Sequence, residues 1–544
     1  MPVVRTSFAR LGRMVGVPRK KILDRLPYIG LDIESVNGDT IRVEYSPNRP
    51  DFGTDFGIAR ALRGILGKET GLPKFEAPDS GVRVSVDPRL SKVRPFIACA
   101  IAKGLRLNEE DVRQLISLQE DLHNGLGRKR KAAAIGLHDV RAIRPPISYR
   151  GVSSEFSFVP LDSVSESTIS KILTDTAEGR AYGATLGDSG VYPVITDSRG
   201  TLLSFPPIIN GDATKVTSKT KDMFVDVTSI NRKTGEDVLA IMATTLAEAG
   251  GSLESVTISY RDGKRTTPDL APTELPIDLP LIQRVLGLEL SKAEVAACLA
   301  RSRMTAKGSK ALGPRYRIDL MHPVDVAEEV ALGYGMDRIA GLYPPSKQAG
   351  EFDRFERFLD SASTVMAGEG MIELMTFELT DMKTLYTNFG RSPEGSISVE
   401  DPKSSEHSLL RDGLVQGLMG ALSGNVKSDY PQKVFEIGRV YTRTKSGVGE
   451  SWHLGSLVAH SQASFSEAKA ALEAVLRALV GKEAVTKSDE YWAFAPGRSA
   501  SVVLDGAHLG WVGEVSPQVL EAFGLRVPVA GFEVDLTVLG KSLK

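Results

Sequence analysis

Four acidic residues around position 320 have the spacing of a metal site. Asp319 is followed by Asp325-Val-Ala-Glu328-Glu329, in which the carboxylates stand three and four residues apart. On a helix this spacing places the carboxylates on one side, and Asp319 can join them from the end of a strand that the pattern predicts at 316–320. Since no cysteine lies nearby, these oxygen ligands favour Mg²⁺ over Zn²⁺.

Helix capping explains the same acidic residues without a metal. Asp325 can act as the N-cap of the helix that begins there, and Glu328 and Glu329 favour the positive end of its dipole. Spacing alone favours capping, and the metal site stands as the second interpretation.

Small polar residues are interleaved with apolar strands between positions 202 and 228. They are Ser204, Asn210, Asp212, Thr214, Thr217, Asp226 and Thr228. Such donors and acceptors among apolar side chains can line a polar pocket. Turn chemistry around Pro206-Pro207 and Asn210-Gly211-Asp212 explains them equally well, so both readings stay open.

A run of four cations, Arg128, Lys129, Arg130 and Lys131, follows a predicted helix and precedes an apolar strand. Contact with nucleic-acid phosphates is the functional interpretation, and a solvated loop is the simpler one. The nearby pair His138-Asp139 suggests acid–base chemistry only weakly, because no nucleophile accompanies it. We therefore interpret His123 and His138 as hydrogen-bonded structural histidines.

The elements that must position these residues point to several mixed domains. With 544 residues, the chain is long enough for about three to five domains of roughly 100–200 residues. Apolar periodicity predicts helices at 54–66, at 108–124 and from about 237 to 249, and strands at 202–209 and 223–227. The sequence therefore predicts a multidomain α+β protein.

Charge and cysteine content limit the classes of function. The net charge is −1, so any nucleic-acid contact must come from local basic patches. Only two cysteines are present, which is normal for a reducing compartment. The sequence has no secretory signal and no apolar stretch long enough to span a membrane, and we expect a cytoplasmic location.

The C-terminal half has no nucleotide-binding signature. Neither GxxxxGK[ST] nor a helix-opening GxGxxG occurs there. Arg411 and Arg439 could bind phosphate or carboxylate groups, but pairing with Asp412 or Glu436 is the expected role.

Eight segments, in order along almost the whole chain, give the sequence a specific resemblance. They are Val43-Glu-Tyr-Ser-Pro-Asn-Arg-Pro-Asp51, Gln119–His123, Arg128–Lys131, Ala134–Asp139, Leu203–Asn210, Tyr316–Asp319, Asp325–Glu329 and Val434–Gly438. Together they resemble the β subunit of phenylalanyl-tRNA synthetase, a class II aminoacyl-tRNA synthetase, in its shorter archaeal and eukaryotic-like form.

The resemblance implies one chain of an α₂β₂ ligase that joins phenylalanine to tRNA(Phe) with ATP and Mg²⁺. The α subunit would bind ATP and hold the synthetic active site. The implied domains are a B1-like α+β domain at 1–75, a β-rich B3/B4 editing domain at 83–257, a helix-rich B5 domain at 268–345 and, at 350–544, an antiparallel class II core without catalytic motifs.

The resemblance also implies roles for individual residues. The editing pocket, which would hydrolyse Tyr-tRNA(Phe), should include Ser204, Asn210, Asp226 and Thr228. Asp226 would accept a hydrogen bond from the tyrosyl hydroxyl, while Thr228 and Asn210 orient the ester or a water. The alternative is a non-catalytic scaffold and tRNA-binding subunit with an inactive pocket.

Asp319, Asp325, Glu328 and Glu329 match the pattern of a family Mg²⁺ site associated with the α subunit. This match favours the metal over simple capping. The stretch between the first two acidic positions, which contains His322, departs from the usual family pattern.

Overall fold

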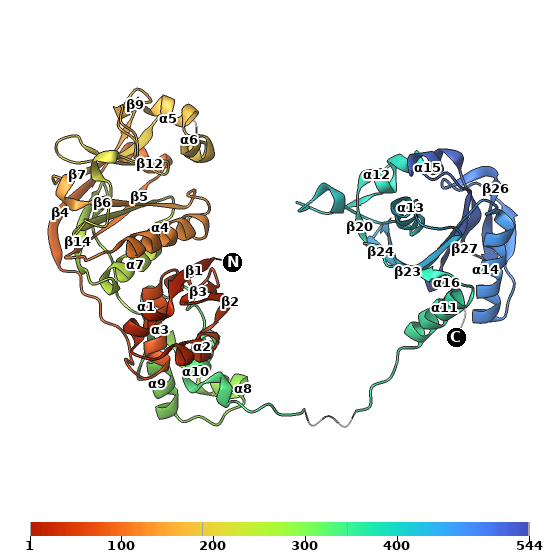
Figure 1. Cartoon of the computed structure of the whole chain (residues 1–544), viewed down its shortest axis with the longest axis horizontal. Coiled ribbons are helices and arrows are strands. Elements are labelled where there is room, and N and C mark those ends of the chain that lie inside the picture. The colour runs from red at the N-terminus through yellow and green to blue at the C-terminus, as the bar shows by residue number, and fades with distance from the viewer. Residues whose placement is uncertain (1, 188, 345, 347, 542–544) are drawn as a thin grey trace. The chain divides into compact units, whose positions relative to one another are not determined.

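The computed structural model describes residues 2–187, 189–344, 346 and 348–541. The chain forms two compact units, the first ending at Tyr343 and the second beginning at Pro344 (Figure 1). Each unit combines helices with β-sheets, which confirms the multidomain α+β class.

The first part of unit 1 is a three-stranded antiparallel sheet with the order β1-β3-β2. The strands are β1 (Val3–Ser7), β2 (Leu31–Asn37) and β3 (Thr40–Tyr45), and the helices are α1 (Phe8–Val15), α2 (Arg19–Arg25) and α3 (Asp55–Ile65). Apolar residues of the helices and of β3 form one buried cluster, so this part has its own core.

The second part of unit 1 is built around a ten-stranded mixed sheet, with the order β12-β11-β10-β7-β4-β14-β5-β13-β6 and β15 paired to β14. Its strands are β4 (Asp79–Val86), β5 (Phe96–Lys103), β6 (Ala133–Asp139), β7 (Ile147–Val152), β10 (Tyr192–Thr196), β11 (Leu202–Phe205), β12 (Ile209–Asn210), β13 (Met223–Ser229), β14 (Ser252–Tyr260) and β15 (Gly263–Thr267).

Alternation along β13 gives the two faces of this sheet different environments. Val225 and Val227 pack in one cluster with α4 (Glu109–Asn124) and α7 (Arg232–Glu248), whereas Phe224 belongs to a cluster with Ile97 and Cys99. Because side chains alternate with a period of two, Asp226 lies on the same face as Phe224. Helix α4 begins after the capping box of Asn108, as predicted, and α7 begins five residues earlier than predicted.

Short elements lie between β7 and β10 along the chain. They are the pair β8 (Ser157–Phe158) and β9 (Ser167–Thr168), followed by α5 (Ile169–Asp175) and α6 (Ala177–Tyr182). Their apolar residues pack with β10 and β11 in a separate cluster, which fixes the segment that follows β11.

The last part of unit 1 has a small sheet, with the order β16-β18-β17, and three helices. The strands are β16 (Thr273–Pro276), β17 (Thr305–Lys307) and β18 (Lys310–Gly313), and the helices are α8 (Leu279–Leu286), α9 (Lys292–Arg301) and α10 (Pro323–Tyr334). The predicted strand at 316–320 is wrong, because these residues form turns. The Arg317 amide donates to the Pro314 carbonyl oxygen at 2.9 Å, which bends the chain there.

Unit 2 is a seven-stranded sheet with the order β19-β23-β24-β28-β27-β26-β25. Its strands are β19 (Ile372–Glu373), β23 (Gln432–Thr444), β24 (Gly447–Ala459), β25 (Val485–Ser488), β26 (Phe494–Leu504), β27 (Ala507–Val515) and β28 (Val529–Asp535). All neighbours are antiparallel except β19 and β23, which are parallel.

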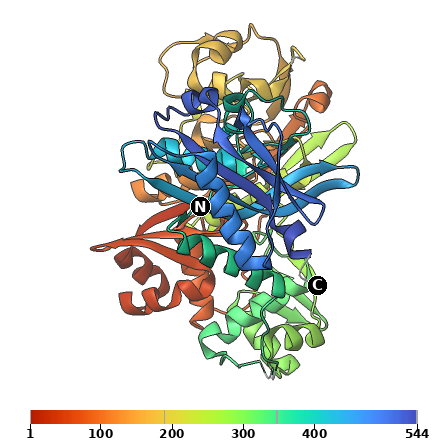
Figure 2. The same ribbon diagram turned by 90° about the vertical axis from the view of Figure 1, so that its right-hand side faces the viewer.

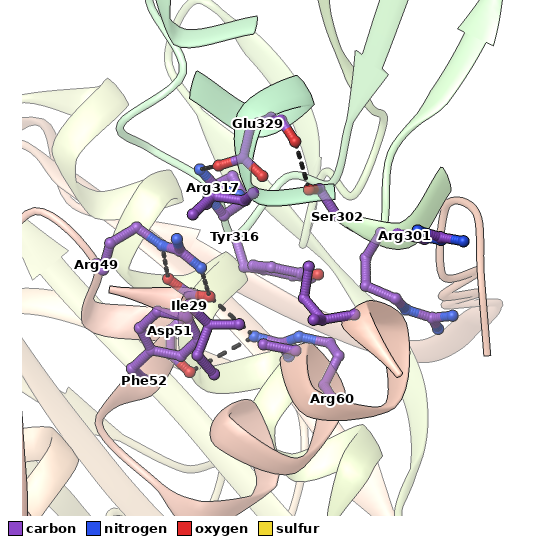
Figure 3. A pocket seen from close by; sticks show the side chains of 14 residues that line it. Ile29, Arg49, Asp51, Phe52, Arg60, Arg301, Ser302, Tyr316, Arg317 and Glu329 are labelled. Carbon is purple, nitrogen blue, oxygen red and sulfur yellow. Dashed lines mark hydrogen bonds and ion pairs between the residues drawn. The ribbon is translucent and has the colours of Figure 1, made fainter. Parts of the chain in front are cut away.

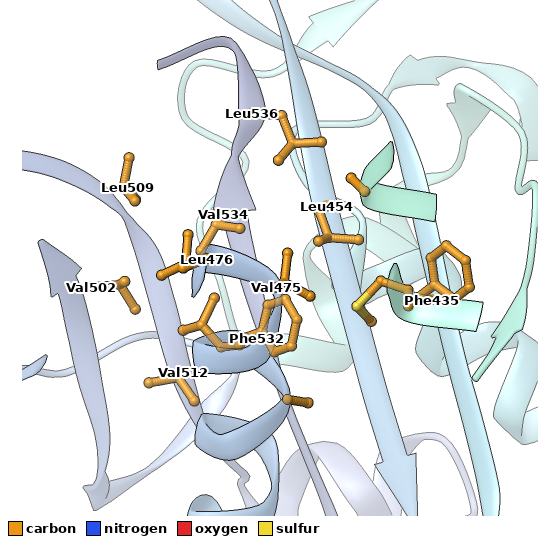
Figure 4. Packing of buried hydrophobic residues seen from close by; sticks show 14 of the residues in the cluster. Phe435, Leu454, Val475, Leu476, Val502, Leu509, Val512, Phe532, Val534 and Leu536 are labelled. Carbon is orange, nitrogen blue, oxygen red and sulfur yellow. The ribbon is translucent and has the colours of Figure 1, made fainter. Parts of the chain in front are cut away.

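Helices cover both faces of this sheet. Helix α14 (Phe465–Val480) packs on it with α11 (Arg354–Gly368) and α16 (Leu536–Lys541) (Figure 2). The core between them includes Phe435 and Phe532 (Figure 4). Helix α13 (Val415–Gly424) and α15 (Pro517–Ala522) contribute to the cluster on the other face. The remaining elements are α12 (Met382–Leu385) and the three strands β20 (Leu379–Thr380), β21 (Ile397–Ser398) and β22 (Leu409–Leu410).

A buried arginine connects three parts of unit 1. Arg60 of α3 donates to Glu248 of α7 at 2.8 Å. It also donates to Asp51 at 3.2 Å, and its guanidinium lies 3.7 Å from the ring centre of Tyr316 (Figure 3). Burial alone would raise the pKa of Asp51, but Arg49, Arg60 and Arg317 outweigh it and lower the pKa to about 2. The charge of this buried carboxylate is therefore maintained by its arginine neighbours.

Replacing Arg60 should destabilise unit 1 strongly. In Arg60→Met the carboxylate of Glu248 loses the side chain that pairs with it, and breaking such a buried pair costs about 3 kcal/mol or more. Urea unfolding followed by far-UV circular dichroism should show an earlier first transition. Tryptophan fluorescence should not shift, because Trp452, Trp492 and Trp511 all lie in unit 2.

Arg42→Met is the matched control, because the Arg42–Glu34 pair is exposed to solvent and should contribute little. Equal shifts for the two variants would contradict the assigned role of Arg60.

Candidate functional site

A cavity of about 460 Å³ lies in the second part of unit 1 and brings together three of the four polar pocket candidates. Ser204 on β11 and Asn210 on β12 face each other in register, and Asp226 enters from β13. The other lining residues come mainly from α4, from the segment after β11 and from 160–163; they include Gln119, Glu120, His123, Arg130, Pro207 and Ile208.

Asp226 is the most distinctive residue of this cavity. Its side chain is almost completely buried, and Oδ2 lies 2.8 Å from Nε2 of His138. Its second oxygen, Oδ1, is buried without a hydrogen-bond partner in the part of the chain that the structure describes. Because leaving a buried acceptor unpaired is costly, this atom marks a position at which a ligand donor would be stabilised.

Thr228, the fourth pocket candidate, does not line the cavity and instead binds Arg94. Its hydroxyl accepts a hydrogen bond from Nε of Arg94 at 2.8 Å, and its carbonyl oxygen accepts a second one from the same guanidinium at 2.8 Å. Burial lowers the pKa of Arg94 to about 10, while Tyr149 and Asp226 act in the opposite direction. Arg94 therefore places a buried positive charge near the Asp226 carboxylate.

The basic run is divided between the cavity wall and the surface. Arg128, Lys129 and Arg130 have positive φ angles of 48°, 54° and 64°, so the chain makes a left-handed turn there. Arg130 lines the cavity, donates to Glu120 at 2.8 Å and to the carbonyl oxygen of Ile208 at 3.0 Å, and leaves its buried Nε without a partner among the described residues. Arg128, Lys129 and Lys131 are exposed to solvent.

His123 supports the cavity wall through hydrogen bonds. Its Nε2 accepts from the amide of Ile135 at 2.8 Å, so the proton lies on Nδ1, which faces Glu120 at 3.1 Å. Burial lowers the pKa of His123, which keeps the ring neutral. This role confirms the structural interpretation of this histidine.

Two of the four acidic candidates at 319–329 are already paired. Arg317 donates to both oxygens of Asp319, at 2.8 and 2.7 Å, and also pairs with Glu329. The predicted N-cap position of Asp325 is wrong, because the helix begins at Pro323 with His322 as its N-cap. From the first turn, Asp325 accepts from the amides of Met321 and His322 at 2.7 and 2.6 Å. Burial and the neighbouring Glu329 raise the pKa of Glu328.

These carboxylates do not fit a magnesium ion as they lie. Mg²⁺ requires several oxygen atoms directed at one point, whereas the guanidinium of Arg317 occupies Asp319 and Glu329. Among the residues that the structure describes, no group of three or more His, Cys, Asp or Glu side chains is arranged to hold a metal ion.

Protein-family models match three regions of the chain. The model of the phenylalanyl tRNA synthetase beta chain CLM domain matches residues 340–536, that of the tRNA synthetase B5 domain matches 275–336, and that of the B3/4 domain matches 105–238. The B3/4 match contains the cavity residues Arg130, Ser204, Asn210 and Asp226.

Whole-chain relatives agree with these matches. A phenylalanine–tRNA ligase beta subunit from Archaeoglobus fulgidus is 40% identical, and the alignment covers 99% of this chain and 98% of the relative. The chain belongs to the phenylalanine–tRNA ligase beta-subunit family. It is therefore a subunit of a ligase enzyme. A second member, from Methanococcoides burtonii, is 36% identical, with 99% of this chain and 100% of the relative covered.

A solved structure from the same family supports the fold of unit 1. The N-terminal fragment of the phenylalanyl-tRNA synthetase beta subunit from Pyrococcus horikoshii aligns with a TM-score of 0.59 and 36% identity. The alignment covers 61% of this chain and 99% of that fragment. None of the helices in the described part of the chain has the length and apolar character that a membrane span requires.

Sequence reasoning missed the partner of the central carboxylate. The sequence indicated only a hydrogen-bonded structural role for His138 and named no partner, whereas the structure shows this histidine bound to Asp226 across two adjacent strands. Only the register of β6 and β13, which places Asp226 opposite Gly136, brings these side chains together. No sequence motif carried this information.

The position of Arg317 predicts how the chain responds to magnesium. Because Arg317 already pairs with Asp319 and Glu329, millimolar MgCl₂ should leave the thermal midpoint of the isolated chain unchanged, and EDTA should have no effect. A magnesium-dependent rise that saturates, and that Asp319→Asn abolishes, would contradict the pairing. CaCl₂ at the same ionic strength is the control for nonspecific salt effects.

Proposed function

We propose that this chain is the β subunit of an enzyme that attaches phenylalanine to tRNA(Phe), and that its cavity hydrolyses tyrosine attached to that tRNA by mistake. Family membership supports the first part. The buried, unpartnered Oδ1 of Asp226 is the observation that carries the second.

The chemical problem explains why such a cavity is useful. A synthetic site that is shaped for an apolar ring discriminates only weakly, about a hundredfold, against a molecule that merely adds a hydroxyl. A second site that hydrogen-bonds the hydroxyl rejects the analogue lacking it much more strongly. In this cavity, Oδ1 of Asp226 would accept from the tyrosyl hydroxyl, whereas a phenylalanyl ring would leave the carboxylate oxygen buried and unpaired.

Ser204 and Asn210 are suited to the ester end of the substrate. They lie opposite each other on neighbouring strands at the cavity wall and offer one hydroxyl and one amide. In the proposed reaction, a water oxygen forms a bond with the ester carbonyl carbon, the bond to the ribose oxygen breaks, and that oxygen takes up a proton. Tyrosine and intact tRNA are released. Thr228 contributes indirectly, by holding Arg94.

The exposed cations near the cavity are suited to the tRNA backbone. Arg128, Lys129 and Lys131 lie on the surface next to Arg130, which itself lines the cavity wall. Cations in this position can bind phosphates of the acceptor end without reading its sequence.

We assign the synthetic chemistry to the α subunit of an α₂β₂ assembly, which would bind ATP and Mg²⁺. In unit 2, Arg411 makes a structural pair with Glu436 at 2.6 Å and is not available to a nucleotide. Apolar side chains at and after the edge strand β19 are exposed instead: Ile372 at 64%, Met375 at 96% and Phe377 at 79%. Such a patch at a sheet edge is typical of a protein interface.

We also place the enzyme in the cytoplasm. Cys99 and Cys298 are both buried and unpaired, which suits a reducing compartment.

Asp226→Asn tests the proposed editing reaction. The purified assembly with the α subunit should hydrolyse Tyr-tRNA(Phe), and the variant should lose this activity by about a hundredfold or more, because the amide presents a different donor and acceptor pattern to the hydroxyl. Asp197→Asn is the matched control. Asp197 is also a buried carboxylate of unit 1, but it accepts backbone amides of a loop and does not line the cavity.

The same experiment separates the editing subunit from the alternative, a non-catalytic scaffold. A wild-type assembly that aminoacylates tRNA but never hydrolyses Tyr-tRNA(Phe) would support the scaffold with an inactive pocket. Hydrolysis that persists in Asp226→Asn would show that the reaction occurs elsewhere.

The proposed subunit contact is tested by Phe377→Asp, with Val448→Asp as control. Both side chains are exposed, but Val448 lies on the β23–β24 hairpin and not in the β19 patch. Burying a charge at an apolar interface is unfavourable, so Phe377→Asp should weaken association with the α subunit by at least about tenfold. Analytical ultracentrifugation of the mixed subunits measures the change. Equal affinity in both variants would place the contact elsewhere.

A further inference from the structure

We propose that His138 is a positioning residue for hydroxyl recognition: it holds Asp226 by Oδ2, which keeps Oδ1 available to the substrate. The inference rests on the proposed editing function and extends it to a residue outside the cavity lining. Three independent observations carry it: a chain of hydrogen bonds, the unpartnered oxygen and a glycine that the arrangement requires.

The hydrogen bonds run from the cavity into the protein. Nε2 of His138 lies 2.8 Å from Oδ2 of Asp226, and Nδ1 of the same ring lies 2.8 Å from the hydroxyl of Thr214. All three side chains are buried. Thr214 lines a second, smaller cavity of about 180 Å³, which shares Asn210 with the first. His138 therefore connects the two cavity walls.

The chain has a direction that follows from the chemistry of its groups. An ionised carboxylate only accepts hydrogen bonds, so Nε2 of His138 carries the proton toward Asp226. In the neutral ring that we infer, Nδ1 has a lone pair and accepts a hydrogen bond from the Thr214 hydroxyl. Thr214 thus selects the ring tautomer that binds the carboxylate, in the way that a hydrogen bond to one ring nitrogen fixes the role of the other.

Gly136 makes the close approach possible. A methyl group at this position would lie 2.1 Å from Oδ2 of Asp226 and 2.5 Å from Nε2 of His138, both far inside contact distance. The φ angle of Gly136 does not require glycine, because it is not positive. The space is therefore taken by the Asp226–His138 pair, which fills the position of a side chain on β6.

The surroundings explain why the carboxylate needs to be held. The other ionisable groups close to Asp226 are Cys99 on β5, Arg94 and Tyr149 on β7. Burial raises the pKa of Cys99 and of Tyr149 and keeps both neutral, so Arg94 provides the positive charge nearby. Without His138, the carboxylate would be free to turn toward Arg94, and Oδ1 would lose its availability to a substrate hydroxyl.

The test compares hydrolysis of Tyr-tRNA(Phe) with hydrolysis of Phe-tRNA(Phe) in the assembled enzyme. His138→Met introduces an apolar side chain of similar size and removes both ring nitrogens. It should lower the Tyr/Phe ratio of kcat/KM by at least about tenfold, which is the size of effect expected for a hydrogen bond to a charged group. His138→Gln, whose amide can donate to Asp226, should recover most of the ratio. A purely structural role would not distinguish the two variants by substrate.

Thr214→Val is a milder second variant for the case in which His138→Met does not fold. It preserves the shape of the side chain and removes only the hydroxyl that selects the tautomer, so it should lower the ratio in the same direction. Thr244→Val is the matched control. Its hydroxyl is also buried, but it donates within α7, to the carbonyl oxygens of Ala240 and Ile241. This variant should change stability without changing the ratio.

The outcomes separate this inference from the proposed function. A wild-type assembly that hydrolyses neither substrate overturns the proposed function, and the role of His138 falls with it. Tyr-specific hydrolysis in the wild type and an unchanged ratio in folded His138→Met or Thr214→Val overturn only the role of His138. A lowered ratio in these variants, with recovery in His138→Gln, supports it.

Discussion

Pairing of buried charge is the constraint on which the arrangement of unit 1 depends. Arg60 is almost completely buried, and taking a guanidinium out of water is tolerable only where carboxylates meet it. Asp51 and Glu248 meet it from segments far apart in the sequence, and the ring of Tyr316 covers its face. The requirement to satisfy one charge therefore fixes α3, α7 and the turn at 314–320 against one another.

In the candidate editing cavity, one atom of a buried charged group has no hydrogen-bond partner among the described residues. Oδ2 of Asp226 is satisfied by His138, while Oδ1 is not satisfied by any described residue. An unpaired acceptor costs stability in the free protein, and a ligand that supplies a donor recovers that free energy. In the proposed editing reaction this atom would favour a ligand with a hydroxyl, because a ligand without one leaves the oxygen unpaired.

Arg317 shows how a buried cation changes the meaning of an acidic motif. Asp319 and Glu329 have the residue types and spacing of magnesium ligands, but in the folded chain they satisfy Arg317. A guanidinium and a divalent cation compete for the same oxygen atoms, since each needs them to compensate its lost hydration. In this chain the positive charge that these carboxylates bind is therefore the guanidinium of Arg317.

The sequence by itself determined the family, the α+β class and several local elements. Helix α4 follows from the capping box of Asn108 and from apolar periodicity, which are local properties of the chain. Through the resemblance, the sequence also predicted one pocket with Ser204, Asn210, Asp226 and Thr228, and the first three line the cavity whereas Thr228 does not. The turn at 316–320 was missed, because its alternating residues have the pattern of a strand, whereas in the folded chain the Arg317 amide closes a turn by donating to the Pro314 carbonyl oxygen.

Tertiary structure alone decided which side chains meet. The pairing of Asp226 with His138, the support of Thr228 by Arg94 and the pairing of Arg317 with Glu329 all depend on strand register or on packing between separate elements. A shift of one residue in β13 would turn Asp226 to the opposite face of the sheet. Local sequence determines which backbone conformations are favourable. Long-range pairing of buried charges selects among them, because the free-energy cost of an unpaired buried charge exceeds the gain from any local conformational preference.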